Sequence, residues 1–380
     1  MQNLVVLGST GSIGKNTLDV VSRTDEFNVV GLSCKSNIDE LSRQIERFKP
    51  KYVCIEDKKS AVIVRERFKE IVVLEKEEGL IELVSFDDVD FVVNAIVGSA
   101  GLLPTYYTLK NRKRLALANK ESLVVAGKIL SEVAKRNSIE IVPIDSEHSA
   151  IYQCLEGKNK KEIEKLILTA SGGPFLDKDF ASATVEDALK HPNWDMGKKI
   201  TIDSATMMNK GFEIIEARWL FDTKNIEVVI HPESIIHSAV EFVDGSIIAQ
   251  MADKDMRIPI AYALFKPRRI NLPFKISLTD IAKLTFRKPD FSRFPTLEFA
   301  FEALRKEDKN LGLILNVADE IAVEAFLSEK IKFVDIFKIL ELSLIRFEDK
   351  LPDEIDSIAE MLNNIKAEID NLIRDEFWRS

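Results

Sequence analysis

Short runs of aliphatic and β-branched residues alternate with longer amphipathic stretches from the start of the chain to about residue 145. These runs are strand candidates, and they lie at residues 4–7, 29–32, 52–55, 71–74, 91–94, 115–118 and 139–142. The stretches between them have the apolar spacing of helices that cross back over a sheet. The alternation predicts an α/β fold whose N-terminal part is a Rossmann-like, doubly wound parallel sheet.

The middle third of the chain has shorter and less regular apolar runs. Its strand candidates lie at residues 166–168, 200–202 and 228–230. Asp244 and Gly245 form a turn dipeptide, which predicts a hairpin between residues 239–242 and 246–251. The strands and the helical stretches between them predict a second α/β domain.

From about residue 296 the apolar residues recur at spacings of three and four. This period marks helices at residues 297–304, 314–328, 333–347 and 353–377. We therefore expect a C-terminal α-helical bundle, and this part of the sequence shows no pattern typical of chemistry.

Composition narrows the class of protein. The chain has 53 Lys and Arg against 62 Asp and Glu, a net charge of -9, which predicts no general attraction to nucleic acid or to an anionic membrane. Cys34, Cys54 and Cys154 show no paired spacing, so a disulfide framework or a thiolate zinc site is not expected. No apolar run reaches the roughly 18 residues of a membrane span, and no secretory signal is visible. A cytoplasmic enzyme is expected.

Three glycines, Gly8, Gly11 and Gly14, follow the first strand candidate and lead into a helical stretch. Glycine permits a tight turn and the close approach of a pyrophosphate, and a helix N-terminus offers unsatisfied N–H groups. The spacing is a variant of the dinucleotide-binding fingerprint. A purely structural turn is the alternative, and the surrounding βα pattern favours cofactor binding.

The turn after the second strand candidate bears on the choice of dinucleotide. An NAD-binding domain places Asp or Glu there, whereas this chain has Lys35, Ser36 and Asn37. A lysine with small hydrogen-bonding residues suits a 2′-phosphate and favours NADP. The alternative is that Lys35 is an ordinary solvated residue.

Asp145 and Glu147 follow the strand candidate at 139–144, at the sheet edge where ligands bind. If the extended conformation continues, both carboxylates point the same way and suit Mg²⁺ or Mn²⁺. The alternative is a simple helix N-cap ahead of residues 148–155.

A second polar cluster begins after the strand candidate at 200–202. Asn209, Glu213 and Glu216 would share one face of a helix, with Lys210 beside them. Ser204 and Thr206 near the helix start suit recognition of an oxyanion or a hydroxyl group. A solvated polar stripe remains the alternative.

Between the two clusters, glycine-containing residues 171–175 and the segment 191–199 describe a lid that closes over a ligand and excludes water. Trp194 lies in this segment, and a core position is the commoner fate of a tryptophan.

Six motifs now resemble one known family. They are Gly-Ser-Thr-Gly-Ser-Ile-Gly at 8–14, Ala-Asn-Lys-Glu-Ser at 118–122, Asp-Ser-Glu-His at 145–148, Ser-Gly-Gly-Pro-Phe at 171–175, His-Pro-Asn-Trp at 191–194 and Asp-Ser-Ala-Thr-Met-Met-Asn-Lys-Gly at 203–211. Together, and in this order, they resemble the 1-deoxy-D-xylulose 5-phosphate reductoisomerase family over the whole chain.

The resemblance implies a site assignment. The metal ligands would be Asp145, Glu147 and Glu213. The catalytic residues would be Lys120, Glu147 and His191. Substrate contacts would come from Lys120, Ser146, Glu147, Ser171, His191, Trp194, Ser204, Asn209, Lys210 and Glu213. Cofactor contacts would come from Thr10, Gly11, Ser12, Ile13, Lys35, Ser36, Asn37, Asn119, Glu121 and Gly197.

The resemblance also implies the reaction. A phosphorylated keto-sugar would be rearranged with the help of Mg²⁺ or Mn²⁺, or of Co²⁺, and NADPH would then reduce the branched aldehyde to 2-C-methyl-D-erythritol 4-phosphate, a precursor of isoprenoids. A related NADP-dependent oxidoreductase acting on another phosphorylated sugar is the alternative. A homodimer is expected because the family is dimeric.

The expected domain boundaries follow from these segments. A cofactor domain would cover residues 1–144, and a catalytic domain 145–265 with the lid at 171–198. A linker at 266–291 would lead to the C-terminal helical domain at 292–380.

Overall fold

The computed structural model describes residues 1–194 and 196–377, so Asp195 of the predicted lid and residues 378–380 of the predicted C-terminal domain lie outside the described residues. The chain forms two compact units, each assembled from separate segments. Unit 1 comprises residues 1–122, 128–149 and 255–273, and unit 2 comprises residues 123–127, 150–254 and 274–380. This division does not test the predicted domain boundaries, which stay predictions.

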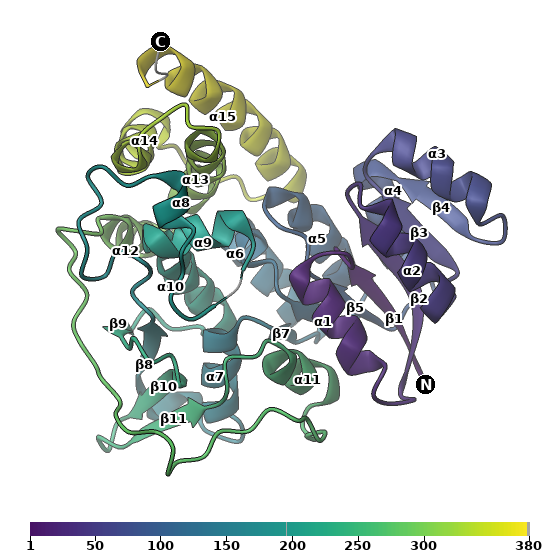
Figure 1. Ribbon diagram of the computed structural model, residues 1–380, viewed down its shortest axis with the longest axis horizontal. Helices are drawn as coiled ribbons and strands as arrows, with labels where there is room; N and C mark the ends of the chain where they lie inside the picture. Colours follow the sequence, from purple (N-terminus) through teal and green to yellow (C-terminus); the bar gives the residue numbers. More distant parts are fainter. Residues whose placement is uncertain (195, 378–380) are drawn as a thin grey trace. The chain divides into compact units, whose positions relative to one another are not determined.

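Unit 1 contains a seven-stranded parallel sheet with the strand order β4-β3-β2-β1-β5-β6-β7, drawn in purple to blue in Figure 1. Its strands are β1 (Gln2–Leu7), β2 (Phe27–Cys34), β3 (Tyr52–Ile55), β4 (Val72–Glu75), β5 (Phe91–Asn94), β6 (Arg114–Leu117) and β7 (Ile141–Pro143). All seven overlap the predicted runs. The order reverses between β1 and β5, which confirms the doubly wound sheet.

The helices of unit 1 mostly follow the strands of this sheet in sequence, and α11 joins them from a later segment of the chain. They are α1 (Ser12–Val21), α2 (Ile38–Phe48), α3 (Lys58–Arg67), α4 (Lys76–Ser85), α5 (Leu102–Lys110), α6 (Lys120–Asn137), the start of α7 (Ser146–Cys154) and α11 (Arg257–Phe265). The central strand is apolar on both sides, since Leu4 and Val6 belong to one buried cluster and Val5 and Leu7 to another. A sheet covered on both faces explains why the strands read as continuous apolar runs.

Unit 2 contains a four-stranded mixed sheet with the order β11-β10-β8-β9. Its strands are β8 (Ile163–Ala170), β9 (Ile226–Ile230), β10 (Ile236–Phe242) and β11 (Ile247–Met251). β10 pairs antiparallel with both β11 and β8, whereas β8 and β9 are parallel. The hairpin predicted at Asp244 and Gly245 joins β10 to β11 and is confirmed.

Unit 2 also contains helices from the middle of the chain, in teal, and from its C-terminal part, which runs from green to yellow in Figure 1. They are α8 (Val185–Ala188), α9 (Lys198–Ala205), α10 (Met208–Phe221), α12 (Thr296–Arg305), α13 (Leu311–Leu327), α14 (Phe333–Phe347) and α15 (Ile355–Glu376). The last four agree with the predicted bundle. Its core is α13, most of whose residues are buried. Among the described residues, no helix is both long enough and apolar enough to cross a membrane.

Candidate active site

The glycine loop of unit 1 has the geometry of a close-approach turn. Gly8 has φ +71°, and a Cβ atom there would lie 2.5 Å from the carbonyl oxygen of Ala95. A Cβ atom at Gly14 would lie 2.4 Å from the carbonyl oxygen of Gly8, so α1 packs directly on the turn. The backbone N–H and hydroxyl of Ser9 donate to the carbonyl oxygen of Ser33, which fixes the loop against β2. Only glycine fits at both ends of this turn.

The N-terminus of α1 faces outward from this loop. Gly11 is the N-cap residue and provides no side-chain hydrogen bond, and Gly11 and Ser12 are both exposed. Thr10 and Ile13 are half-buried. The first-turn N–H groups of a helix carry the positive end of its dipole, so this end can accept the phosphate of a dinucleotide.

The turn after β2 is solvent-exposed. Lys35 is 80% exposed and lies 3.9 Å from the carboxylate of Glu56. Asn37 caps α2, because its side-chain oxygen accepts a hydrogen bond from the N–H of Glu40 at 3.2 Å. Ser36 is also exposed. The predicted phosphate-binding turn is therefore accessible, and Asn37 has a structural role there as well.

Asn119 and Glu121 are buried at the start of α6. The amide of Asn119 donates to the carbonyl oxygens of Ile96 and Gly98, both at 2.8 Å, and to the carboxylate of Glu121 at 2.9 Å. Its side-chain oxygen accepts from the N–H of Ser122. Asn119 therefore ties the loop after β5 to the N-terminus of α6.

Asp145 and Glu147 lie where β7 leads into α7. The extended conformation predicted for them is wrong, because α7 already begins at Ser146. Asp145 precedes the helix and its carboxylate faces the N–H of Glu147 at 3.4 Å, as an N-cap does. Helical geometry still brings the carboxylates together, with oxygens of Asp145 and Glu147 within 4.8 Å of one another.

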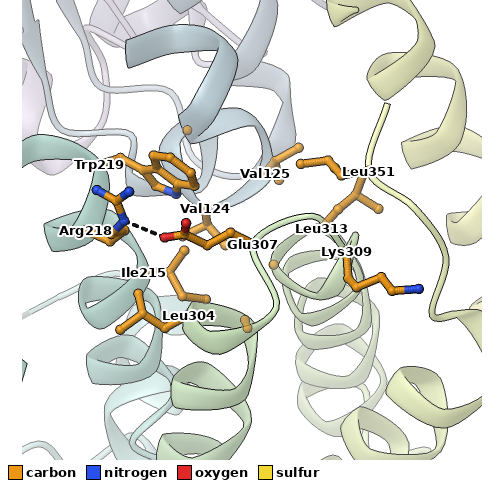
Figure 2. Close-up of a pocket in the computed structure, with 13 residues that line it drawn as sticks. Val124, Val125, Ile215, Arg218, Trp219, Leu304, Glu307, Lys309, Leu313 and Leu351 are labelled. Carbon is orange, nitrogen blue, oxygen red and sulfur yellow. Dashed lines mark hydrogen bonds and ion pairs between the residues drawn. The ribbon is translucent and has the colours of Figure 1, made fainter. Parts of the chain in front are cut away.

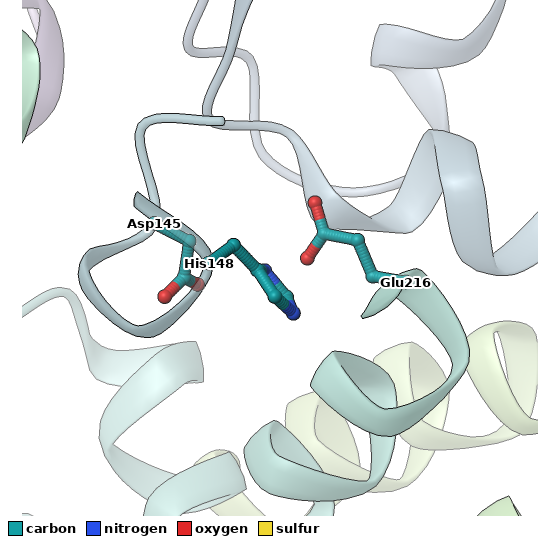
Figure 3. Close-up of side chains that lie close together, drawn as sticks. All are labelled: Asp145, His148 and Glu216. Atoms are coloured by element: carbon teal, nitrogen blue, oxygen red, sulfur yellow. The ribbon is translucent and has the colours of Figure 1, made fainter. Parts of the chain in front are cut away.

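Three further groups lie beside this carboxylate pair in unit 1. The ammonium group of Lys120 lies 2.6 Å from the carboxylate of Asp145, and both side chains are largely buried. The hydroxyl of Ser146 bonds to Glu147. Figure 3 shows Asp145 and His148 extending from the same turn, each offering a ligand atom within 4.8 Å of the other. His148 is completely buried, and no role was predicted for it.

The polar face of α10 is not a solvated stripe, so that alternative is wrong. Glu213 and Glu216 are buried, and so is Lys210. Lys210 forms an ion pair with Glu213, and the amide of Asn209 donates to Glu213 at 2.6 Å. A charged cluster is rarely buried without a partner or a ligand, so this face is a candidate site.

The strand predicted at 200–202 is also wrong, because these residues belong to α9. Alternating Ile and Thr imitate a strand, but Thr201, Ile202 and Ala205 are buried at helical spacing. The carboxylate of Asp203 accepts a hydrogen bond from Lys199, four residues earlier, at 2.7 Å. Contacts along and around the helix thus override the β propensity of the isoleucines.

The loop that carries Ser171 packs against the end of α9. Gly173 has φ +68°, and a Cβ atom there would lie 2.4 Å from the carbonyl oxygen of Ser204. Two predicted substrate-binding serines therefore come from backbone segments in direct contact.

His191 joins this group through its side chain. Its Nε2 lies 3.1 Å from the hydroxyl oxygen of Ser171. Its Nδ1 accepts hydrogen bonds from the N–H groups of Asn193 at 3.1 Å and Trp194 at 3.0 Å. Burial lowers the pKa of His191 to about 4. The imidazole is therefore neutral, with its proton on Nε2 and directed at Ser171.

Trp194 is half-buried, and its ring lies 6.2 Å from the ring of His237. Gly197 is exposed and is the N-cap residue of α9. Sequence reasoning assigned no role to Asn193. Its amide donates to the carbonyl oxygen of Pro232 at 2.6 Å and to the hydroxyl of Ser234 at 3.2 Å, which holds the predicted lid against the loop before β10. The sequence feature that could have pointed to Asn193 is its position between His191 and Trp194, which were both assigned roles.

The chain matches one protein family along its length. Three family models match. The model for 1-deoxy-D-xylulose 5-phosphate reductoisomerase matches residues 4–127. Two models for the C-terminal domain of this enzyme match residues 141–221 and residues 251–368. A 1-deoxy-D-xylulose 5-phosphate reductoisomerase of Thermoanaerobacter sp. is 50% identical over 378 residues, covering 97% of this chain and 98% of the relative. That of Bacillus subtilis is 48% identical, covering 98% and 100%.

The chain belongs to the 1-deoxy-D-xylulose 5-phosphate reductoisomerase family.

Solved reductoisomerase structures share the whole fold. One, in complex with NADPH, fosmidomycin and magnesium, has a TM-score of 0.93 and 40% identity, covering 99% of this chain and all of that one. Another, from Zymomonas mobilis in complex with NADPH, has a TM-score of 0.90 and 37% identity, covering 98% and 99%. The predicted combination of Rossmann-like sheet, α/β part and helical bundle is that of the family.

The cavity shown in Figure 2 is a poor candidate for the reductoisomerase site. It lies in unit 2 between α10, α12 and α13, has a volume of about 30 Å³, and is lined by apolar side chains such as Ile215 and Leu304, with an ion pair of Arg218 and Glu307 at one side. None of the residues assigned from the family resemblance lines it.

Proposed function

We propose that the protein converts 1-deoxy-D-xylulose 5-phosphate to 2-C-methyl-D-erythritol 4-phosphate with NADPH and a divalent metal ion. The single observation that carries the proposal is the chain-long family match, which includes relatives solved with NADPH, magnesium and fosmidomycin. The contacts within unit 2 support it, since Ser171, His191 and Ser204 lie in one connected group there.

The proposed metal ligands are Asp145, Glu147 and Glu213. Asp145 and Glu147 offer oxygens within 4.8 Å of one another, a spacing near that of two ligands on one cation. Glu213 is a fully buried carboxylate on α10. An all-oxygen set suits Mg²⁺ or Mn²⁺, with Co²⁺ also possible, better than it suits zinc.

The proposed NADPH site is the glycine loop with the N-terminus of α1. The turn at Gly8 and the backbone at the start of α1, with the proposed contacts Thr10, Gly11, Ser12 and Ile13, suit a pyrophosphate. The exposed turn of Lys35, Ser36 and Asn37 suits the 2′-phosphate. The other proposed cofactor contacts are Asn119, Glu121 and Gly197.

The substrate would be held mainly by unit 2. The hydroxyl of Ser171 lies within bonding distance of the N–H of Gly173 at 3.3 Å and of Nε2 of His191, so its own proton is available to an anionic oxygen. Ser204, Asn209 and Lys210 add a hydroxyl, an amide and an ammonium group for the phosphate. Trp194 would cover the sugar, and Ser146 and Lys120 would contact its oxygens.

The chemistry divides between these residues and the bound groups. When bound, the metal ion would polarise the carbonyl and hydroxyl oxygens of the substrate, and NADPH would supply a hydride. Lys120 carries a positive charge beside Asp145 and would stabilise charge on a substrate oxygen. Glu147 would orient the hydroxyl that loses its proton. His191 would hold Ser171 in its donating orientation, and Trp194 would exclude water from the aldehyde.

Identification of the product tests this proposal. Purified protein, substrate, NADPH and Mg²⁺ should give a single product whose phosphorus NMR signal and mass match 2-C-methyl-D-erythritol 4-phosphate. A different reduced phosphate would support the alternative substrate.

A homodimer is part of the proposal. β11 is an edge strand of the unit 2 sheet, and its Ile247 is 56% exposed, next to exposed Ile248 and Val243. Exposed apolar edge strands favour pairing with a second chain. Light scattering should give twice the mass of 43.0 kDa for the wild-type protein and about one chain mass for Ile247→Lys. A monomeric wild type would contradict it.

The remaining proposals concern location and domain limits. We place the enzyme in the cytoplasm, where its three buried free cysteines would stay reduced. The catalytic domain would cover 145–265, with the lid at 171–198, between a cofactor domain at 1–144 and a linker at 266–291 before the helices of 292–380.

A further inference from the structure

Arg293 fixes the loop that follows Ser171. Its guanidinium donates to the carbonyl oxygen of Phe175 at 2.9 Å and also to that of Lys178. The same guanidinium lies 4.8 Å from the ring of Phe180. The ring of Phe180 in turn contacts a cluster of aromatic side chains at 5.5–5.8 Å, namely Phe294, Phe333 and Phe337. One arginine therefore attaches residues 175–180 to the C-terminal helices.

Asp319 of α13 fixes the helix that carries Ser204. The ammonium group of Lys199 lies 2.5 Å from the carboxylate of Asp319 and 2.7 Å from that of Asp203. Asp319 is fully buried and the side chain of Lys199 is 18% exposed, so this ion pair is largely shielded from water. Lys199 is in the first turn of α9, and the pair therefore attaches α9 to α13.

The two attachments meet at the candidate site. Ser171 precedes the segment held by Arg293, and Ser204 lies in the helix held by Asp319. The backbone of Gly173 touches the carbonyl oxygen of Ser204, so a displacement of either segment moves the other. Sequence reasoning found no chemistry in the C-terminal helices, yet both attachments come from that part of the chain.

We propose that Arg293 and Asp319 are positioning residues that hold the Ser171 loop and the Ser204 helix at the spacing the substrate phosphate requires. The inference rests on the proposed function of those serines. Neither residue is proposed to touch the substrate. A displacement of about 1 Å in groups that hold a substrate is enough to weaken binding severely.

Paired variants separate position from general stability. Asp319→Leu removes the attachment of α9 while Lys199 keeps Asp203 as a partner, so no buried charge loses its only counter-charge. Asp319→Asn keeps a hydrogen-bond acceptor for Lys199. Arg293→Met removes the donors to both carbonyl oxygens, and Arg293→Lys restores one of them. Glu307→Gln, which removes the ion pairs of Glu307 with Arg218 and Lys224 in the same unit, is the matched control.

The measurements are KM and kcat for 1-deoxy-D-xylulose 5-phosphate, the dissociation constant of NADPH and the melting temperature. Asp319→Leu and Arg293→Met should raise KM by about tenfold or more while NADPH binding stays within about twofold. Asp319→Asn and Glu307→Gln should stay within about threefold of the wild type, and Arg293→Lys should fall between. Folded Asp319→Leu and Arg293→Met proteins with unchanged KM would overturn the inference.

Amide hydrogen exchange keeps the two proposals separable. In ligand-free protein, Asp319→Leu should speed exchange in 198–206, and Arg293→Met in 171–180, relative to the rest of unit 2. If wild-type protein fails to turn over the substrate, the proposed function falls, and local exchange still tests the attachments. Uniform exchange changes across unit 2 would show a purely global role and overturn the positioning inference.

Discussion

The imidazole Nε2 of His191 lies 3.1 Å from the hydroxyl oxygen of Ser171, and this contact fixes the state of both groups. Two backbone N–H groups donate to the opposite ring nitrogen, so a proton on Nδ1 would face two donors. The neutral ring with its proton on Nε2 is the form that satisfies all three contacts. His191 is therefore a fixed hydrogen-bond donor.

The pKa of His191 leads to a prediction about stability. Burial lowers this pKa from its ordinary value of 6.5 to about 4, so the unfolded chain binds a proton between these values that the folded protein does not. The free energy of unfolding should therefore fall as the pH decreases from 6.5 towards 4. His191→Gln does not titrate, and its stability relative to the wild type should rise over that window.

Denaturant unfolding of both proteins at several pH values checks this prediction, and nitrogen NMR of the imidazole checks the tautomer. A His191 that titrates near 6.5 in the folded protein would contradict it.

Glu213 should be essential for turnover. Glu213→Gln removes one proposed metal oxygen and its charge while keeping the side-chain size, so metal-dependent turnover should fall by about a hundredfold or more. NADPH binding, measured by fluorescence titration, should hardly change because the glycine loop is in unit 1. Glu216→Gln, one turn further along α10, is the comparison. Loss of turnover in Glu216→Gln alone would assign the ligand to Glu216.

The glycine loop can be tested with two alanine variants of similar backbone conformation. Gly8 has φ +71° and a tight neighbour, whereas Gly157 has φ +70° and open space within 4 Å of the position that a Cβ atom would take. Gly157→Ala should cost about 1 kcal/mol of stability through the backbone alone. Gly8→Ala should cost more and should weaken NADPH binding, as calorimetric titration would show. If the two variants lost the same stability and the same NADPH affinity, the claim that Gly8 is needed for a close approach of the backbone would be wrong.

The strands and bundle helices were predictable because their apolar patterns match how they are buried. The central strand β1 of unit 1 is covered on both faces, so its apolar run is continuous, and α13 is apolar along most of its length because most of its residues are buried. The strand predicted at Ile200 and Ile202 was wrong because an alternation of three residues is too short to distinguish a strand from a helix. The ion pair of Lys199 and Asp203, which stabilises the helix there, spans a full turn.

The site was less accessible to sequence reasoning than the fold. The spacing of Asp145 and Glu147 suggested that an extended chain would point both carboxylates the same way. In the structure the two carboxylates are close because α7 begins between them. The burial of Lys210 and Glu213 could not be read from one helix, since it depends on neighbours far away in the sequence. Arg293 and Asp319 lacked any local motif, because their partners lie 115 and 120 residues away.

The most direct test of the central claim is NADPH absorbance over time with purified protein, 1-deoxy-D-xylulose 5-phosphate and Mg²⁺ or Mn²⁺, repeated after chelation. The proposed function predicts steady oxidation that stops with the chelator and resumes when metal is restored. NADPH that binds but is not oxidised in the presence of metal would contradict it.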